Sequence, residues 1–123
     1  MQRPVTIAIA EDHDKFREVL RLSLNNAGFH VVASAPNGRD LLQQLVHLAE
    51  PPQLCITDLH MPLLDGYELV PLLKRTYPFI RIAVYSTSDD YYTQQEMKQR
   101  GADVFISKAD TVEHFLAVLQ SLK

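Results

Sequence analysis

The sequence has little of several features that would place it in other classes of protein. Its one cysteine, Cys55, cannot form an internal disulfide, and its neighbours Leu54 and Ile56 predict a buried thiol. No apolar run approaches the ~20 residues that span a membrane, and no secretory signal peptide precedes the first apolar run at Val5. The sequence also lacks a Lys/Arg cluster, and its net charge of −3 disfavours direct nucleic-acid binding. A cytoplasmic protein that does not associate with membranes is therefore expected.

The composition that remains is that of an ordinary globular domain. The apolar fraction is 46% and the charged fraction is 22%, both typical of soluble proteins. A length of 123 residues predicts one domain, 1–123, with one hydrophobic core. The chain stops just after its last helical pattern. The possibility that residues 1–123 are a domain excised from a longer protein therefore stays open.

The order of the apolar segments predicts the fold class. Five short β-branched or apolar runs alternate with longer segments of helical period. This alternation is typical of the α/β class, and it predicts a single-domain, doubly wound, five-stranded parallel sheet with helices on both faces. The expected strands are 5–10, 30–35, 54–57, 80–85 and 104–107.

The segments between the strands differ in how much apolar surface they offer. Apolar residues recur three and four positions apart in 16–27, 41–49 and 112–122, which predicts helical faces that pack on the sheet. The segment 91–100 is rich in glutamine and polar residues instead. We expect this fourth helix to be the most loosely packed element.

Local signals predict where two helices begin. Asp65 and Glu68 have the spacing of a capping box at the start of the third helix, and Asp110 and Glu113 repeat it before the last helix. Pro71 lies inside the third helical segment, where it removes one backbone donor. We expect Pro71 to bend or delay that helix.

The chemistry-bearing residues follow the predicted strands. Open parallel sheets bind ligands beyond the carboxyl ends of their strands, so residues at those positions are expected to lie together. They are Glu11 and Asp12 after the first strand, Asp58 after the third, Ser86 and Thr87 after the fourth, and Lys108 after the fifth.

Such a group of side chains favours phosphoryl chemistry with a metal ion. Three carboxylates at one edge repel one another unless a cation lies among them. Hard carboxylate oxygens suit Mg²⁺, which commonly bridges to a phosphate oxygen. An aspartate in such a site can attack a phosphoryl group, while the metal, a lysine ammonium and hydroxyl donors neutralise the transferring oxygens.

These residues resemble those of a known family. Together with Met61-Pro62, Gly66 and "GADVFISKAD" around Lys108, they resemble the receiver domains of two-component response regulators over nearly the whole chain. The resemblance implies a flavodoxin-like strand order, 2-1-3-4-5. It implies a phosphoacceptor signalling switch and not a turnover enzyme. The phosphoryl group would come from a phosphohistidine of a sensor histidine kinase or phosphotransfer protein and would be accepted by Asp58.

The resemblance also implies a Mg²⁺ site. Asp12, Asp58 and the backbone carbonyl of His60 would hold the ion directly. Glu11 would act through a water molecule.

Further positions correspond to the phosphoryl-binding and switch residues of the family. Ser86 would bind one phosphoryl oxygen and Lys108 another, and Phe105 would occupy the aromatic switch position. Many relatives carry a small alanine where Thr87 stands, so Thr87 is expected to affect access to the acceptor. Ala109 replaces a proline that often follows the lysine, a feature of receivers linked to helix-turn-helix output domains.

The resemblance finally implies how the signal leaves the domain. Phosphorylation would change the face formed by the fourth helix, the fifth strand and the fifth helix. That face would control an output domain or a protein partner, with homodimerisation as one form of the interaction. Transcription regulation would be the outcome, without direct nucleic-acid contact by this domain.

Two other functions fit the same residues less well, and a third stays open. A haloacid dehalogenase-type phosphatase would pair Asp12 with Asp14, but it needs Thr or Val where this chain has Phe16, and it normally has a larger chain. A flavin mononucleotide carrier needs a hydroxyl- and glycine-rich phosphate loop, whereas the acidic segment 11–14 would repel phosphate. A purely structural interaction module stays open, although the complete set of acidic residues, acceptor and lysine argues against it.

Each residue alone also has an ordinary explanation. Asp58 could begin a turn, and an isolated Lys108 would be a surface residue. The joint pattern at the ends of four strands favours the functional interpretation. Tyr91 and Tyr92 are interpreted as helix-start residues. Among the histidines, which lack metal-binding spacing, only the one beside the acceptor gains interest; they are His13, His30, His47, His60 and His114.

Overall fold

Strands and helices alternate along the chain in this computed structural model, which describes residues 3–123. The strands are β1 (Thr6–Ala10), β2 (His30–Ala35), β3 (Leu54–Thr57), β4 (Arg81–Ser86) and β5 (Val104–Ser107). The helices are α1 (Asp14–Asn26), α2 (Gly38–Val46), α3 (Gly66–Thr76), α4 (Tyr91–Arg100) and α5 (Val112–Ser121). All five predicted strands are confirmed, and only the bounds of β1 and β4 differ from the predicted ones, by one residue.

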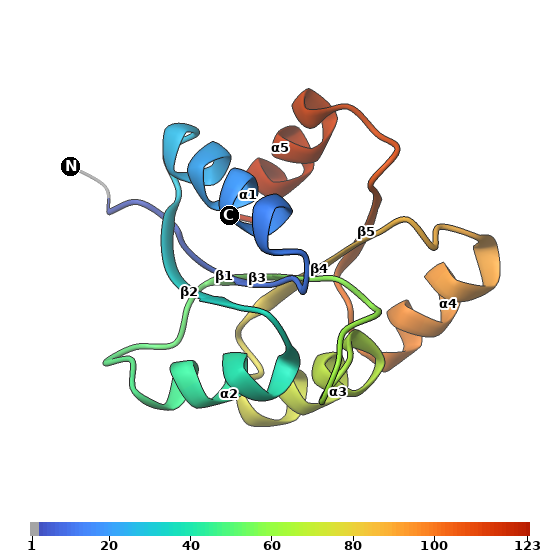
Figure 1. The fold of residues 1–123 in the computed structure, drawn as a ribbon, viewed down its shortest axis with the longest axis horizontal. Coiled ribbons are helices and arrows are strands. Elements are labelled where there is room, and N and C mark those ends of the chain that lie inside the picture. Colours follow the sequence, from blue (N-terminus) through green and yellow to red (C-terminus); the bar gives the residue numbers. More distant parts are fainter. Residues whose placement is uncertain (1–2) are drawn as a thin grey trace.

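The sheet is parallel throughout and has the predicted strand order, β2-β1-β3-β4-β5. Helices α1 and α5 cover one face, and α2, α3 and α4 cover the other (Figure 1). This arrangement confirms the doubly wound α/β fold, and it brings the carboxyl ends of all the strands to one edge. Within residues 3–123, none of the helices has the length and apolar character needed to cross a membrane.

The sheet separates two hydrophobic clusters. Successive side chains of a strand point to opposite faces, and β4 shows this clearly. Ile82 and Val84 belong to the cluster under α2, α3 and α4, whereas Ala83 and Tyr85 belong to the cluster under α1 and α5. A single strand therefore contributes to both layers of the core.

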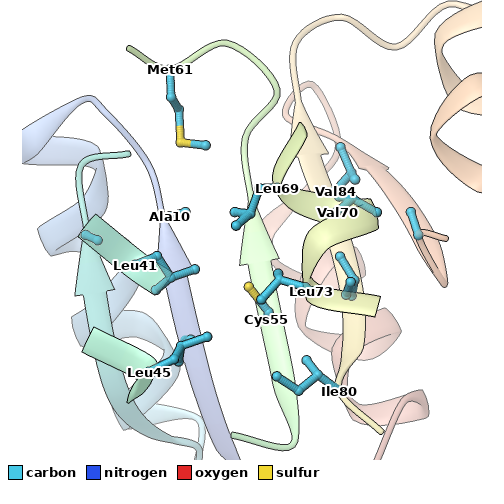
Figure 2. Close-up of a cluster of buried hydrophobic side chains, with 14 of the residues drawn as sticks. Ala10, Leu41, Leu45, Cys55, Met61, Leu69, Val70, Leu73, Ile80 and Val84 are labelled. Carbon is cyan, nitrogen blue, oxygen red and sulfur yellow. The ribbon is translucent and has the colours of Figure 1, made fainter. Parts of the chain in front are cut away.

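Cys55 lies in the first cluster, beside leucines of α2 and α3 (Figure 2). Its side chain is fully buried, and burial raises the pKa of the thiol to about 12. The predicted buried thiol is confirmed, and at neutral pH it is protonated.

The predicted helical faces are confirmed only at their centres. Leu20 and Leu24 of α1 are buried, but Val19 is 59% exposed. Val46 at the end of α2 and Val112 at the start of α5 are also exposed. A helix on a flat sheet buries a narrow stripe, so residues at the margins of the apolar face stay in solvent. Helix α4 buries Met97 alone among its residues, as its polar sequence predicts.

One of the two predicted helix caps is wrong. Asp65 caps α3 as expected, with its Oδ1 accepting the N–H of Glu68 at 3.0 Å. Helix α5 is capped by Thr111, whose Oγ1 accepts the N–H of His114 at 3.1 Å. Asp110 instead closes a turn after β5, because its N–H donates to the carbonyl of Ser107 at 3.1 Å. The helix consequently starts one residue later than predicted.

Pro71 does not delay α3, which runs from Gly66 to Thr76 with the proline inside it, and the predicted bend stays a prediction. In an α-helix, the N–H missing at position 71 would bond to the carbonyl of Tyr67. That carbonyl accepts a hydrogen bond from Nη1 of Arg100 at 2.9 Å instead. The guanidinium also lies 5.7 Å from the centroid of the Tyr67 ring. A residue of α4 thus satisfies the acceptor that the proline frees, and this contact ties α4 to α3.

We expect Arg100→Ala to lower the free energy of unfolding by about 1 kcal/mol, the usual contribution of one hydrogen bond. In a Pro71→Ala background the helix regains its own donor, so the same substitution should cost less. Urea unfolding of the wild type, the two single variants and the double variant measures this difference in cost. Lys98→Ala, which removes another cation from the last turn of α4, is the control. Equal costs of Arg100→Ala in both backgrounds would contradict the link.

Candidate functional site

Three carboxylates converge where β1 and β3 end. One oxygen each from Glu11, Asp12 and Asp58 lies within 4.8 Å of the other two. Glu11 is buried, Asp58 is half-buried and Asp12 is exposed. The backbone holds two of them in place, because Glu11 donates its N–H to Ala35 and Asp58 donates its N–H to Ala10, both at 3.0 Å. The predicted acidic cluster is therefore present.

The ammonium of Lys108 lies among these carboxylates. Its Nζ is 2.6 Å from Oε1 of Glu11 and 2.8 Å from Oδ2 of Asp58. The side chains of all three residues are at most 16% exposed, so the ion pairs are poorly screened by water. Lys108 reaches this position because β5 lies beside β4, and its own N–H donates to the carbonyl of Ser86 at 2.9 Å.

Burial and neighbouring charges act in opposite directions on the pKa values of Lys108 and Glu11. Burial alone would lower the pKa of Lys108, but its hydrogen bonds and ion pairs with Asp58 and Glu11 outweigh burial and raise that pKa. For Glu11, burial dominates and raises the pKa, although the bonds from Lys108 and from the His13 N–H oppose it. The lysine therefore stays charged, and it is the counter-ion that keeps this edge compatible with several carboxylates.

An aromatic wall borders the ammonium. Its Nζ lies 4.5 Å from the ring centroid of Phe16 and 5.9 Å from that of Tyr85. Tyr85 in turn stacks on Phe115 with 4.2 Å between ring centroids. These contacts limit water access to one side of the lysine, and cation–π attraction further favours its charged form. The sequence pattern places Phe16 on a helical face but does not predict this contact, because nothing in the local pattern relates Phe16 to Lys108.

The hydroxyl residues at the end of β4 differ in exposure. Ser86 is fully buried, and its Oγ accepts the N–H of Ser88 at 3.1 Å. A hydroxyl that accepts one bond still has its own hydrogen to donate. Thr87 is exposed at the rim. Ser86 therefore offers a buried donor at the edge where the acidic cluster lies, and Thr87 faces solvent.

The side chain of His60 makes contacts that the sequence does not predict. Its Nε2 lies 3.2 Å from Oγ of Ser88, and its ring lies 6.0 Å from that of Tyr67, centroid to centroid. The contact with Ser88 joins the loop after β3 to the loop after β4. Neither residue type signals such a contact in advance. The role of the His60 carbonyl as a metal ligand stays a prediction.

The turn after Asp58 explains the sequence "MPLLDG". The N–H of Leu64 donates to the carbonyl of Pro62 at 2.7 Å, which places Leu63 at φ 66° in the left-handed region. The chain then returns, so that Gly66 lies against the backbone of Asp58. A Cβ at position 66 would overlap the Asp58 carbonyl oxygen and lie 2.8 Å from Cα of Leu59. Glycine is therefore required here for steric reasons, and it lets the start of α3 pack against the backbone of Asp58.

The donor set of the acidic cluster fits a hard divalent cation. All its potential ligand atoms are carboxylate oxygens, with no thiolate or imidazole among them. Mg²⁺ prefers such oxygen donors and usually keeps several waters, which the exposed position of Asp12 allows. The residues present therefore fit Mg²⁺, the ion that the sequence predicts.

Comparison with known families agrees with this geometry. The family model for the response regulator receiver domain matches residues 7–120. The chain belongs to this family. The receiver domain assignment sets aside the phosphatase and flavin carrier alternatives, which belong to other families.

Two relatives of this receiver domain are named response regulators. It is 31% identical over 119 residues to response regulator MprA of Mycolicibacterium vanbaalenii, covering 97% of this chain and 50% of MprA. It is 32% identical over 121 residues to the nitrate/nitrite response regulator protein NarL of Escherichia coli K12, covering 96% of this chain and 54% of NarL. The receiver domain thus spans about half the length of these relatives.

Solved structures share the fold of this receiver domain. Chemotaxis protein CheY4 of Vibrio cholerae has a TM-score of 0.88 at 25% identity, with 98% of this chain and 99% of that chain covered. The CheX-CheY complex of Borrelia burgdorferi gives a TM-score of 0.90 at 18% identity, with 97% of this chain and 89% of that chain covered.

We expect Lys108→Met to lower the free energy of unfolding by about 3 kcal/mol in the presence of a chelator, because it leaves buried carboxylates without their counter-ion. The folded-state pKa of Lys108 lies above its ordinary 10.5, so this stabilisation is complete below that pH and is lost as pH rises through the folded-state value. The gap between wild type and variant should therefore close at high pH. Urea unfolding across pH measures it.

The exposed Lys15 provides the control for this measurement. Lys15→Met removes a similar charge from the surface and should change stability little. Equal unfolding midpoints for wild type and Lys108→Met at neutral pH would contradict the counter-ion role.

Proposed function

We propose that this receiver domain is a phosphorylation-dependent signalling switch in which Asp58 is the phosphoacceptor. The observation that carries the proposal is the convergence of Glu11, Asp12 and Asp58 within 4.8 Å around the ammonium of Lys108. A nucleophilic carboxylate, further carboxylates for a metal ion and a lysine for the incoming oxygens are the parts that phosphoryl transfer to aspartate requires. The phosphoryl group comes from a phosphohistidine of a partner kinase or phosphotransfer protein.

The two oxygens of Asp58 are held differently, and this difference orients the reaction. Oδ1 accepts the N–H of Leu59 at 2.7 Å, while Oδ2 pairs with Lys108 at 2.8 Å. A carboxylate oxygen of Asp58 forms the new O–P bond as the P–N bond of the phosphohistidine breaks, and the imidazole leaves with the electron pair. Asp12, Asp58 and the His60 carbonyl would hold Mg²⁺, with Glu11 acting through water, and the ion would supply positive charge for the phosphoryl oxygens.

The other side chains at the edge complete the phosphoryl site. Lys108 exchanges its contact with the Asp58 carboxylate for one with a phosphoryl oxygen, so the ion pair with the free acceptor serves as a precursor of the product contact. The buried Ser86 hydroxyl donates to another phosphoryl oxygen. Thr87 stands at the rim and governs access of water and donor. Because the reacting carboxylate is itself modified, the domain is not a turnover enzyme, and later hydrolysis of the acyl phosphate resets it.

The face formed by α4, β5 and α5 carries the signal outward in this proposal. Phe105 of β5 is half-buried and packs against the cluster under α2, α3 and α4. It borders a cavity of about 300 Å³, into which a side chain can move. The cavity is lined by Gln94, Gln95, Lys98, Ala102, Asp103, Val104, Phe105 and Val118. Movement of Ser86 toward a phosphoryl group opens space for Phe105 and shifts the weakly anchored α4.

The partners follow from this chemistry. We propose a cytoplasmic location, a sensor histidine kinase or phosphotransfer protein as donor, and an output domain or protein partner, including a second copy, as receiver of the signal. The half-length coverage of MprA and NarL supports residues 1–123 as the receiver domain of a longer regulator. Their names as response regulators, and that of the related DNA-binding transcriptional regulator NtrC, support control of transcription through an output domain.

Incubation with phosphoramidate and Mg²⁺ should add one alkali-labile phosphoryl group to the wild-type protein. Intact-mass measurement detects the group, and Asp58→Asn should abolish it because the nucleophilic carboxylate is gone. Asp65→Asn is the matched control, since it changes a nearby aspartate that only caps α3. Labelling of Asp58→Asn to the wild-type extent would refute the acceptor assignment.

The switch is tested by NMR with beryllofluoride, which mimics the phosphoryl group on Asp58. We expect large chemical-shift changes over residues 86–100 and around Phe105, because both regions rearrange. Ser86→Ala should reduce these changes strongly, since it removes the donor that draws β4 toward the site. Changes confined to residues that touch the ligand would argue against the switch.

A further inference from the structure

Residues 87–90, which connect β4 to α4, are held from both sides. On the β3 side, Oγ of Ser88 lies 3.2 Å from Nε2 of His60. On the β5 side, Oγ of Ser107 donates to Oδ2 of Asp89 at 2.6 Å. Strand β4 lies between β3 and β5, so these two contacts act on the 87–90 loop in opposite directions.

The contact between Asp89 and Ser107 also reaches Lys108. Oγ of Ser107 accepts the N–H of Ala109 at 3.1 Å, on the far side of the lysine. On the helix side, the carbonyl of Asp89 accepts a hydrogen bond from Nε2 of Gln94 at 2.6 Å. One carboxylate residue in the loop is therefore bonded both to the segment that carries Lys108 and to the first turns of α4.

We propose that Asp89 is a positioning residue that acts through Ser107 and restrains the 87–90 loop in the unphosphorylated state, thereby opposing the switch. This inference rests on the proposed function. A phosphoryl group on Asp58, at the end of β3, draws Ser86 and the loop after it toward β3. The hydrogen bond from Ser107 holds the same loop toward β5. Activation must therefore break it.

Charge and exposure make this hydrogen bond suitable for a reversible restraint. A hydroxyl donating to a carboxylate is a strong, charge-assisted bond. Asp89 is exposed, however, so water can replace its partner when the loop moves.

Release of the restraint should strengthen binding of a ligand that prefers the active arrangement. We expect the Kd of beryllofluoride with Mg²⁺ to fall about three- to tenfold in Asp89→Ala and in Ser107→Ala, the range for loss of one hydrogen bond. The double variant should equal either single variant, because each substitution removes the same bond. Calorimetric titration measures these affinities.

Two further variants separate the loss of the Asp89–Ser107 hydrogen bond from the effects of changing a side chain or a surface charge. Ser107→Thr keeps the hydroxyl and should restore wild-type affinity. Asp110→Asn removes an exposed negative charge close to Lys108 without removing the donor or acceptor of the restraint, and it should also bind like wild type. Unchanged affinity in both alanine variants, or additive effects in the double variant, would overturn the proposal.

Amide hydrogen exchange without beryllofluoride tests the restraint independently of phosphorylation. Exchange over residues 87–90 should be several-fold faster in Asp89→Ala and Ser107→Ala, and wild-type in Ser107→Thr. Failure of the proposed function would appear differently, as absence of beryllofluoride binding by the wild-type protein. Even then, amide exchange over residues 87–90 shows whether Asp89 restrains the loop. Faster exchange in both alanine variants supports the restraint, and unchanged exchange overturns it.

Discussion

The ion pairs of Lys108 are the interaction on which the functional edge depends. Glu11 and Asp58 are held with little solvent where parallel strands end, and their mutual repulsion would oppose folding without a cation between them. The lysine supplies that charge, and the ring of Phe16 screens it from water on one side. Folding thus assembles an acidic cluster that already contacts one positive charge, and its carboxylate oxygens suit a divalent cation as well.

Backbone constraints fix Asp58 within this electrostatic arrangement. Asp58 is anchored by its N–H to β1, and the turn that follows brings Gly66 against its carbonyl with no space for a side chain. The first turn of α3 therefore begins in contact with Asp58. Helix α3 is in turn linked to α4, because Pro71 leaves the Tyr67 carbonyl to Arg100. A continuous set of backbone and side-chain contacts therefore joins Asp58 to α4, the helix that the sequence predicts to be the most loosely packed.

The parts that the sequence predicted share one property: they depend on strand periodicity and on residue types at strand ends. Alternation of apolar runs predicted the sheet, and parallel topology then placed Glu11, Asp58 and Lys108 together. Contacts between side chains distant in sequence could not be predicted in this way. They include His60 with Ser88, Ser107 with Asp89, and Arg100 with Tyr67. The cap of α5 was misplaced because a turn after β5 competes for Asp110.

Strand β4 contributes alternate side chains to both layers of the molecule, Val84 toward α2, α3 and α4 and Tyr85 toward α1 and α5. Tyr85 also stacks on Phe115 of α5, whereas Phe105 of the neighbouring β5 packs against the cluster under α2, α3 and α4. A displacement at the end of β4 cannot be confined to one layer, because each layer is packed against the same backbone. Two proteins bound to opposite sides of this domain would therefore read the same event, and binding of one would alter the affinity for the other without any contact between them.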